Sequence, residues 1–289
     1  MAKSHLFRWL VGAATVGTLL GTPSLSHAYP YYRYDAGPST LTLDRMDSSQ
    51  RAGLQVGLDK WHHYYSDGDS ALAMRFELYG QYVLPSRNFG LYGGLALAHL
   101  FADAPDPSGT GISNLDVGAF FMPDHTSDLI FRVGMILPTA SDSASGYAAN
   151  DAVAFERLTD LLLHYPHVTA LRLSVSTVQQ SGLAFFRGDL GFDLVFDRGD
   201  LPYRGTNTFL RLNLAAGVRL PVLDLAVELV NFGALDGDGP VEDRFLHTVT
   251  VGFSTRGVDQ FRLGLVFPLD DYLRDELWIL SLGYQHAYY

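Results

Sequence analysis

Apolar and polar residues alternate with a period of two along most of the chain beyond residue 50, which is typical of β-strands whose two faces meet different surroundings. In AMRFELYGQYVL, Met74, Phe76 and Leu78 share one face, whereas Arg75 and Glu77 share the other. The stretches RGDLGFDLVFD, FLRLNLAAGVRL and FRLGLVF repeat the alternation. The pattern predicts an all-β protein.

We expect about twelve strands, most of them about ten residues long, which suits a tilted strand that crosses the core of a bilayer. Short links such as PSRN and RGVD follow the even-numbered strands, and long links such as HYYSDGDS and residues 139–167 follow the odd-numbered ones. This alternation is typical of outer-membrane barrels, which have tight periplasmic turns and long outer loops. The expected strands are 52–62, 71–84, 89–101, 112–122, 128–138, 168–178, 183–197, 206–220, 222–232, 245–255, 258–267 and 276–286.

The chain ends on an amphipathic strand, ELWILSLGYQHAYY, in which Trp278, Leu280 and Leu282 share one face. An unpaired edge strand is an aggregation hazard, and lipid offers no partner to a free backbone N–H or C=O group. We therefore predict that the last strand pairs with the first. The predicted fold is a transmembrane, antiparallel, up-and-down β-barrel over residues 51–289.

The face opposite the apolar one carries charges of both signs in the middle of the strands, and a membrane barrel would turn this face toward its lumen. A soluble β-sandwich would instead turn it toward solvent, and the alternation alone leaves that alternative open. Because poorly paired buried charges are costly, we expect a hydrated lumen in which the charged residues line a path for solutes. They are Arg75, Glu77, Asp116, Arg132, Arg172, Arg187, Asp189, Asp193, Arg211, Arg219, Asp224, Glu228 and Arg262.

Residues 1–28 are expected to be a secretory signal peptide, with Lys3 and Arg8 at its start, the apolar stretch WLVGAATVGTLLG, and a cleavage point near Ala28. A membrane-anchor helix is the alternative, but the apolar stretch is shorter than the roughly 18 residues that such a helix needs. Export and the barrel pattern together predict location in the bacterial outer membrane. We expect residues 29–50 to be an N-terminal periplasmic segment, either a tail or a plug.

Composition narrows the classes of partner and cofactor. Without cysteine, the chain has no disulfide, Cys-ligated zinc or Cys-linked lipid anchor. The formal charge of −11 becomes −13 when Lys3 and Arg8 are removed, which argues against a nucleic-acid partner. No cofactor and no metal are expected, because ALDGDGPVEDRF lacks the full calcium-loop pattern and the adjacent His62 and His63 point to opposite sides of a strand. The net negative charge lies mainly in the long links, which carry Asp67, Asp69, Asp103, Asp106, Asp236, Asp238, Glu242, Asp243, Asp270, Asp271, Asp275 and Glu276.

The third long link contains NDAVAFERLTDLLLHYP, whose apolar residues between 152 and 162 have roughly helical spacing. Asn150 or Asp151 is the expected N-cap, and Pro166 the expected end. We predict a short amphipathic helix in this outer loop, which either packs on its own barrel or folds into the mouth as a constriction.

The sequence contains no arrangement of residues that a barrel enzyme would need. An outer-membrane phospholipase would show a His with a Ser two residues later, followed by Asn-Gly, and a lipid A deacylase a similar His-Ser pair; neither run is present. Asp124 and His125 are of the types that an omptin-like protease uses, but they fall in a short, periplasmic link. We therefore expect no enzymatic activity.

The chain resembles bacterial outer-membrane β-barrel proteins in its signal peptide, its strand and link pattern and its terminal WILSLGYQHAYY. The resemblance implies that the barrel-assembly machinery reads the C-terminal strand and that outer-membrane lipid and lipopolysaccharide surround the barrel. Tyr288 is the terminal aromatic residue in phase, whereas His286 and the additional Tyr289 depart from the family pattern. GISNLDVGAFFM and VGMILPT, followed by a long loop, also resemble the outer-membrane transporters grouped with phenol-degradation operons.

Two functions are compatible with this pattern. The first is a channel or transporter that passes a small, unidentified solute through the charged lumen. The alternative is a closed barrel that acts as a structural or surface-interaction module without transport.

Overall fold

The computed structural model describes residues 42, 49–62, 70–86, 88–102, 108–123, 128–198, 207–236 and 244–288. All of them belong to one compact unit, Asp35–Tyr289. The predicted signal peptide, most of the expected N-terminal segment, Asp124, His125 and Tyr289 lie outside the described residues, as do His63 and the acidic residues Asp67, Asp69, Asp103, Asp106, Asp238, Glu242 and Asp243.

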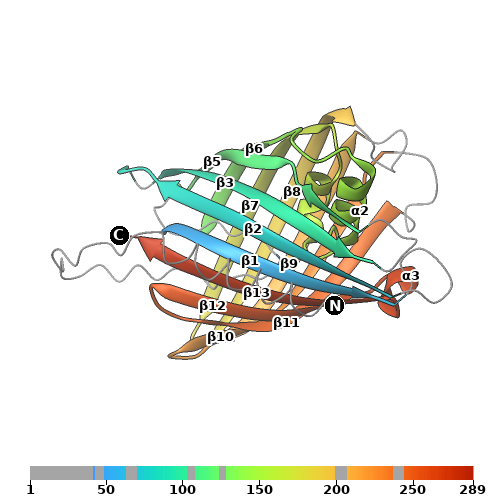
Figure 1. Ribbon diagram of the computed structural model, residues 1–289. Helices are drawn as coiled ribbons and strands as arrows, with labels where there is room; N and C mark the ends of the chain where they lie inside the picture. Colours follow the sequence, from blue (N-terminus) through green and yellow to red (C-terminus); the bar gives the residue numbers. More distant parts are fainter. Residues whose placement is uncertain are drawn as a thin grey trace. The chain divides into compact units, whose positions relative to one another are not determined.

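The strands form one antiparallel sheet that closes on itself as a barrel of twelve crossing strands (Figure 1). The prediction that the first strand pairs with the last is confirmed, since β1 runs beside β13 from Gln50↔Tyr288 to Trp61↔Leu277 and beside β2 on its other edge. The strands are β1 (Gln50–Trp61), β2 (Ala71–Val83), β3 (Phe89–Phe101), β4 (Gly109–Ile112), β5 (Leu115–Phe121), β6 (Leu129–Leu137), β7 (Val168–Ser181), β8 (Ala184–Arg198), β9 (Thr208–Arg219), β10 (Leu223–Ala234), β11 (Phe245–Thr255), β12 (Asp259–Pro268) and β13 (Leu277–Tyr288).

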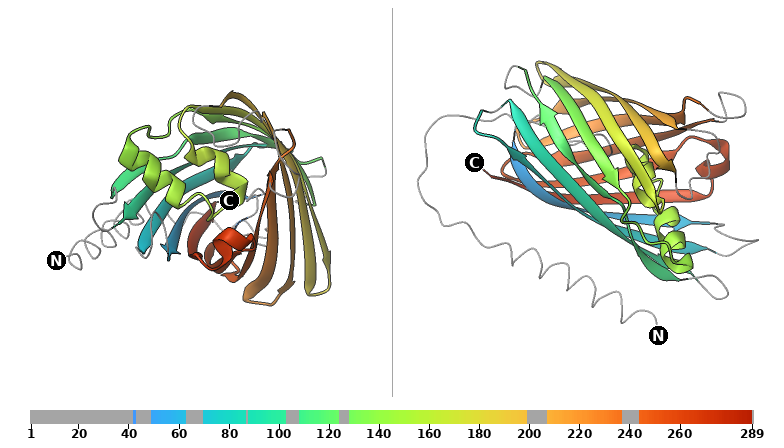
Figure 2. Two further views of the ribbon diagram at one scale, coloured as in Figure 1. Left: turned by 90° about the vertical axis from the view of Figure 1, so that its right-hand side faces the viewer. Right: turned by 90° about the horizontal axis from the view of Figure 1, so that it is seen from above.

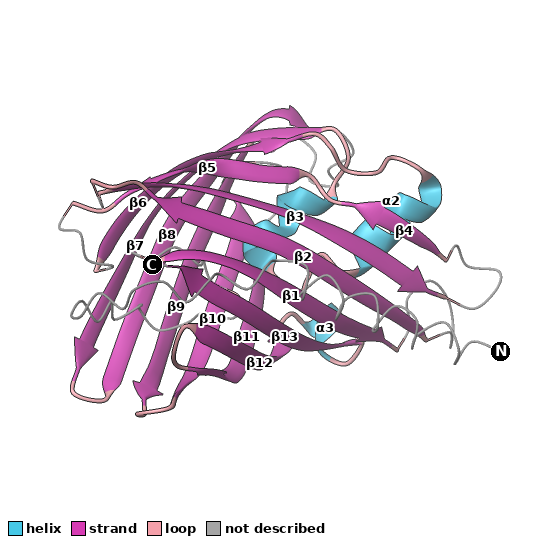
Figure 3. Cartoon of the chain, turned by 60° about the vertical axis from the view of Figure 1, so that its left-hand side comes forward, coloured by secondary structure: helices cyan, strands magenta, loops and turns pink. Residues whose placement is uncertain are grey.

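The links give the barrel two different ends. Its turn end carries short connections such as Gly182–Leu183, where Gly182 adopts a positive φ of 59° that glycine tolerates without strain. Its loop end carries the long connections, among them residues 138–167 between β6 and β7. Both the start of β1 and the C-terminus lie at the turn end (Figure 3).

The two faces of the strands have opposite surroundings, as the period of two predicts. Leu78 on β2 and Phe261 on β12 are 59% and 58% exposed, whereas Arg75 on β2 is 1% exposed. Apolar side chains thus cover the outside of the barrel and charged side chains fill its inside. That is the reverse of a soluble protein and suits a surface that faces hydrocarbon.

The fourth crossing strand differs from the single strand expected at 112–122, because it is split into β4 and β5 at Ser113 and Asn114. Ser113 N–H still bonds the Ala96 carbonyl of β3 at 2.9 Å, but Asn114 N–H donates to the carbonyl of Leu163 at 2.7 Å. The break therefore turns backbone groups of the barrel wall toward the link between β6 and β7, which satisfies them in place of a neighbouring strand.

The long link between β6 and β7 contains the predicted short helix, but at a different place. Helix α2 (Ala144–Ala152) begins after Ser143, whose hydroxyl accepts from Gly146 N–H at 3.3 Å, and a 3₁₀ helix, η1 (Leu158–His164), follows. Asn150 and Asp151, the expected caps, lie in the last turn of α2. A third helix, α3 (Asp271–Arg274), lies at the same end of the barrel (Figure 1). Within the described ranges, no helix is long and apolar enough to span a bilayer.

This link occupies the barrel mouth at the loop end (Figure 2, left). Leu158, Leu161 and Leu162 of η1 pack with inward residues of β7 to β11, and Ala149 and Val153 pack with inward residues of β1, β2 and β13. All of residues 158–165 are buried. We call residues 143–165 the plug. The main apolar core of the protein lies between the plug and the barrel wall.

The lipid-facing surface generates the first prediction. Leu78→Arg, in the middle of β2, should destabilise the barrel in lipid vesicles by about 2–4 kcal/mol, because the guanidinium would enter the midplane of the bilayer. The matched change Leu235→Arg, at the loop end of β10, should cost only about 0–1 kcal/mol. Urea unfolding in vesicles measures both, and equal costs at the two sites would contradict the placement of the lipid boundary.

Candidate functional site in the barrel lumen

All thirteen charged residues expected to line the lumen lie on the inner face of the barrel, and each is at most 7% exposed. Seven of them come together in one central ion-pair network. The other six form smaller groups nearer the turn end or on the opposite wall. The seven are Arg75, Glu77, Asp116, Arg132, Arg172, Asp193 and Arg211.

Arg172 of β7 is the centre of one half of this network. Its guanidinium lies 3.0 Å from Asp116 of β5, 3.3 Å from Asp193 of β8 and 3.3 Å from Asp160 of the plug. Arg132 adds a second contact to Asp116 at 2.5 Å, and Arg211 a second contact to Asp193 at 3.1 Å. Asp116 and Asp193 are thus each shared by two arginines, which offsets the cost of burying their charge.

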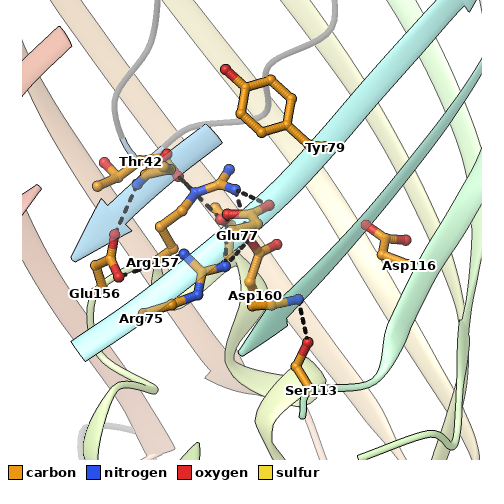
Figure 4. A network of polar contacts seen from close by, with 12 residues as sticks. Thr42, Arg75, Glu77, Tyr79, Ser113, Asp116, Glu156, Arg157 and Asp160 are labelled. Atoms are coloured by element: carbon orange, nitrogen blue, oxygen red, sulfur yellow. Dashed lines mark hydrogen bonds and ion pairs between the residues drawn. The ribbon is translucent and has the colours of Figure 1, made fainter. Parts of the chain in front are cut away.

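Arg75 of β2 is the centre of the other half (Figure 4). It lies 2.8 Å from Glu77 on its own strand, and 3.6 Å from both Glu156 and Asp160 of the plug. Arg157 of the plug forms ion pairs in the other direction, with Glu77 of the wall at 3.6 Å and with Asp160 of the plug at 2.7 Å. The wall and the plug are therefore joined by ion pairs inside the barrel.

Sequence reasoning did not single out the plug residues Glu156, Arg157 and Asp160, because it left open whether their helix packs on the barrel or folds into the mouth. The available signal was the presence of charged residues within FERLTDLLLH, an otherwise strongly apolar run. An isolated charge among leucines in a barrel protein needs a buried partner, and the inward-facing charges of the strands are the partners at hand.

Thr42 shows that part of the N-terminal segment also enters the lumen. Its backbone N–H and its hydroxyl both donate to Glu228 of β10 at 2.7 Å. Its carbonyl accepts from Arg157 at 3.4 Å and from the Thr159 hydroxyl at 3.1 Å. Thr42 therefore joins the barrel wall to the plug and supplies two hydrogen bonds to the buried carboxylate of Glu228.

The remaining predicted residues form pairs away from the central network. Arg187 and Asp189 lie 3.0 Å apart along β8, and Arg219 of β9 lies 3.4 Å from Asp224 of β10. Arg262 of β12 has its guanidinium 5.5 Å from the ring centroid of Tyr79, whose hydroxyl it also hydrogen-bonds.

A small hollow of about 50 Å³ remains in the lumen below the plug. Arg157, Asp160 and Leu163 of the plug line it on one side, and the Tyr79 and Tyr92 side chains of β2 and β3 on another. The Arg132 guanidinium lies 4.2 Å above the ring of Tyr92, a cation–π contact that holds both groups at the wall. Three arginines and three carboxylates line the hollow, so that its charge is balanced; they are Arg75, Arg132, Arg157, Glu77, Asp116 and Asp160.

Burial changes the protonation of the plug. Desolvation lowers the pKa of His164 to about 3, and neither of its ring nitrogens has a hydrogen-bond partner, so that it stays neutral in the barrel. Desolvation also raises the pKa of Glu156, against the opposing effect of Arg75. For Asp160, desolvation would raise the pKa, but Arg157 and Arg172 together hold it below its usual value.

The described part of the chain contains no group of three or more His, Asp or Glu side chains that could hold a metal ion. The site therefore consists of ion pairs, two aromatic rings and a hollow. Such an arrangement can bind and orient a dipolar solute, or can close a lumen, by exchanging ion pairs for contacts to the solute.

Comparison with known proteins identifies the fold. Neither a family model nor a curated protein matches the chain. Among solved structures, the COG4313 outer membrane channel from Pseudomonas putida F1 is similar with a TM-score of 0.59 and 14% identity, over 89% of this chain and 100% of that one. The fold is that of the bacterial outer-membrane β-barrels.

Other outer-membrane barrels superpose less well. LpxR from Salmonella typhimurium has a TM-score of 0.47 and 9% identity, over 82% of this chain and 100% of that one. The P. putida toluene transporter TodX has a TM-score of 0.45 and 9% identity, over 83% and 90%. At these identities the likeness extends to the fold and not to residues of a site.

The ionic network generates a second prediction. Arg172→Met should destabilise this outer-membrane barrel by about 3–5 kcal/mol, because it leaves Asp116, Asp160 and Asp193 buried with one cation fewer. Arg274→Met should cost about 1 kcal/mol or less, since Arg274 pairs with Asp271 at an exposed position. Urea unfolding in micelles measures the difference, and a cost for Arg172 as small as that for Arg274 would show that the network contributes little.

His164 generates a third prediction, which concerns low pH. A released plug would bind a proton on His164 below about pH 6.5, whereas the docked plug excludes it until about pH 3, so that docking weakens as the pH falls through 6.5. Between pH 7.5 and 5.0, the wild type should lose about 2 kcal/mol more unfolding free energy than His164→Leu. An identical pH dependence of the two proteins would contradict the buried, neutral state of His164.

Proposed function

We propose that the protein is a channel of the bacterial outer membrane that passes small polar solutes through its lumen, and that the plug closes this channel. The observation that carries the proposal is a polar hollow in the lumen below the plug, which is lined by ionic and aromatic side chains. At about 50 Å³ the hollow holds water alone while the plug is docked, so that a solute passes only when the plug moves. A barrel that served only as a scaffold could fill this space with apolar side chains, as its loop end does.

Balanced charge favours a dipolar or neutral solute. The described inner residues of the barrel and the plug include nine buried arginines and nine buried carboxylates. A lumen with one sign of charge would concentrate ions of the other sign, whereas a balanced lumen does not. The nine arginines are Arg51, Arg75, Arg132, Arg157, Arg172, Arg187, Arg211, Arg219 and Arg262, and the nine carboxylates are those of Asp59, Glu77, Asp116, Glu156, Asp160, Asp189, Asp193, Asp224 and Glu228.

A closed barrel with a structural or surface-interaction role is the second candidate. It is favoured by the burial of all thirteen predicted lumen residues, because an open water-filled pore would expose them. The two candidates differ in whether the plug leaves the mouth. The attachment of the plug through hydrogen bonds and ion pairs, with no covalent link to the facing strands, supports the channel.

We also propose the partners of the barrel in the membrane. Outer-membrane lipid and lipopolysaccharide would contact its apolar surface, and the assembly machinery would engage β13. His286, which departs from the usual terminal pattern, donates through Nδ1 to the Asp259 carboxylate of β12 at 2.8 Å, and the Tyr284 hydroxyl donates to the same carboxylate at 2.7 Å. This neighbour explains how β13 accommodates a polar residue near its end.

Removal of the plug tests the channel. Replacing residues 142–166 with a short Gly-Ser linker should convert a barrel with rare openings into one with steady conductance in planar bilayers, with a reversal potential near zero because the lumen charge is balanced. Asn114→Ala should act in the same direction more weakly, since its side-chain amide donates to the Leu162 and Tyr165 carbonyls of the plug.

Shortening the link between β8 and β9, within residues 200–205, is the matched control and should leave the conductance unchanged. If the wild type, the plug deletion and Asn114→Ala all insert and none conducts or admits sugars and amino acids into vesicles, the structural role replaces the channel.

A further inference from the structure

Strand β1 contains a socket for one plug side chain, Glu156. The carboxylate of Glu156 lies directly above Gly57, and a Cβ atom at Gly57 would come within 1.8 Å of Glu156 Oε2. The side-chain amide of Gln55 donates to Glu156 Oε1 at 2.9 Å, and the Ser281 hydroxyl donates to it at 3.3 Å. A side chain at position 57 would displace the Glu156 carboxylate from its present place, so that Glu156 keeps this place only beside a glycine.

Asp59 lies near this socket on the same strand, close enough for its charge to interact with that of Glu156. It lies two residues beyond Gly57 on the same face of β1, with Cα atoms on the order of 7 Å apart. It is 0% exposed, and neither carboxylate oxygen has a hydrogen-bond partner among the described residues. Asp59 interacts electrostatically with Glu156, which repels its charge, and with Arg75, which attracts it.

A count of charges shows that this region holds one carboxylate too many. Among the described residues, five arginines of the central network face six carboxylates. Arg75, the cation nearest to the socket, is already shared by Glu77, Glu156 and Asp160, and Arg157 by Asp160 and Glu77. The five are Arg75, Arg132, Arg157, Arg172 and Arg211, and the six are Asp59, Glu77, Asp116, Glu156, Asp160 and Asp193.

We propose that Asp59 and Glu156 form one proton-binding site, and that the proton they share latches the plug into the barrel. The bound proton neutralises the surplus carboxylate and allows one carboxyl group to donate to the other. When the proton leaves for bulk water, two like charges remain in a water-excluded socket, and the plug is driven out. This inference concerns docking alone and holds whether or not a solute passes through the lumen.

The direction of the pH effect follows from linkage. The docked plug holds one proton that the released plug loses above about pH 4.5, so that docking weakens as the pH rises. The other titratable groups facing the socket are Glu77, Asp160 and His164, beside the cations Arg75 and Arg157. His164 acts in the opposite direction, and only below about pH 6.5, so that a comparison of variants which all retain it isolates the latch.

The absence of cysteine from the chain provides the experiment. Ala149→Cys places a single thiol on α2 at a fully buried position of the docked plug. We would measure the rate at which maleimide labels this thiol in the refolded full-length protein. Dividing it by the labelling rate of a small free thiol at the same pH removes the pH dependence of thiol reactivity, so that the ratio reports release of the plug. Between about pH 7 and 9, where His164 is neutral in both the docked and the released plug, this ratio should rise several-fold per pH unit, up to the tenfold limit for one proton.

Adding Asp59→Asn or Glu156→Gln should abolish this rise, because each removes one carboxylate and keeps the shape of the side chain. A separate single cysteine, Ala226→Cys, at a buried position of β10 near the turn end, serves as the control for unfolding and should show no rise. A profile that Asp59→Asn leaves unchanged overturns the proposal. An equal rise in labelling rate at both cysteines, which indicates unfolding, also overturns the proposal. So does a labelling rate that changes with the sodium concentration at constant pH.

The socket itself is tested without titration. Gly57→Ala should make the thiol at position 149 react rapidly at every pH, since its methyl group occupies the place of the Glu156 carboxylate. Gly94→Ala is the matched control, because a Cβ there meets no atom closer than 3.5 Å and should leave the labelling slow at low pH. Equal labelling of the two alanine variants would show that Glu156 is not held in this socket.

Discussion

A strand that crosses hydrocarbon finds no water for its backbone N–H and C=O groups, and the whole barrel follows from this constraint. Pairing of β1 with β13 removes the free edges, so that every crossing strand has a neighbour on each side. The one interruption, between β4 and β5, occurs where the plug supplies substitute partners: Asn114 N–H bonds the Leu163 carbonyl, and its side chain bonds those of Leu162 and Tyr165.

Closure also decides where charge can be placed. Apolar side chains must face the lipid, and polar positions of the alternating pattern must therefore face inward, where water is scarce once the plug is docked. Arginine suits this setting because its planar guanidinium reaches several carboxylates at once, as Arg75 and Arg172 do. The plug contributes Glu156, Arg157 and Asp160 to the same network, so its position depends on the ionic balance of the wall.

The plug combines two kinds of contact with different consequences. Its apolar residues fill the loop end, where Trp61 also donates to the Ala152 carbonyl at 2.9 Å, and they favour the docked state under all conditions. Its charged residues favour docking only while each carboxylate has a cation or a proton. A closed state with these two components is stable and still responsive, because a change of one charge in a buried socket alters the balance substantially.

The sequence alone determined the barrel. The period of two, the alternating link lengths and the amphipathic last strand placed the strands within a few residues. They also identified the thirteen charged residues of the inner face, because successive side chains of a strand point to opposite faces and the face of each residue can therefore be found from its neighbours in the sequence. Only the tertiary structure decided that residues 143–165 enter the mouth, that β4 and β5 separate at Ser113 and Asn114, and that Asp59 lies near enough to Glu156 for their charges to interact. These depend on contacts between residues far apart in the chain, whose geometry exists only once the sheet has closed.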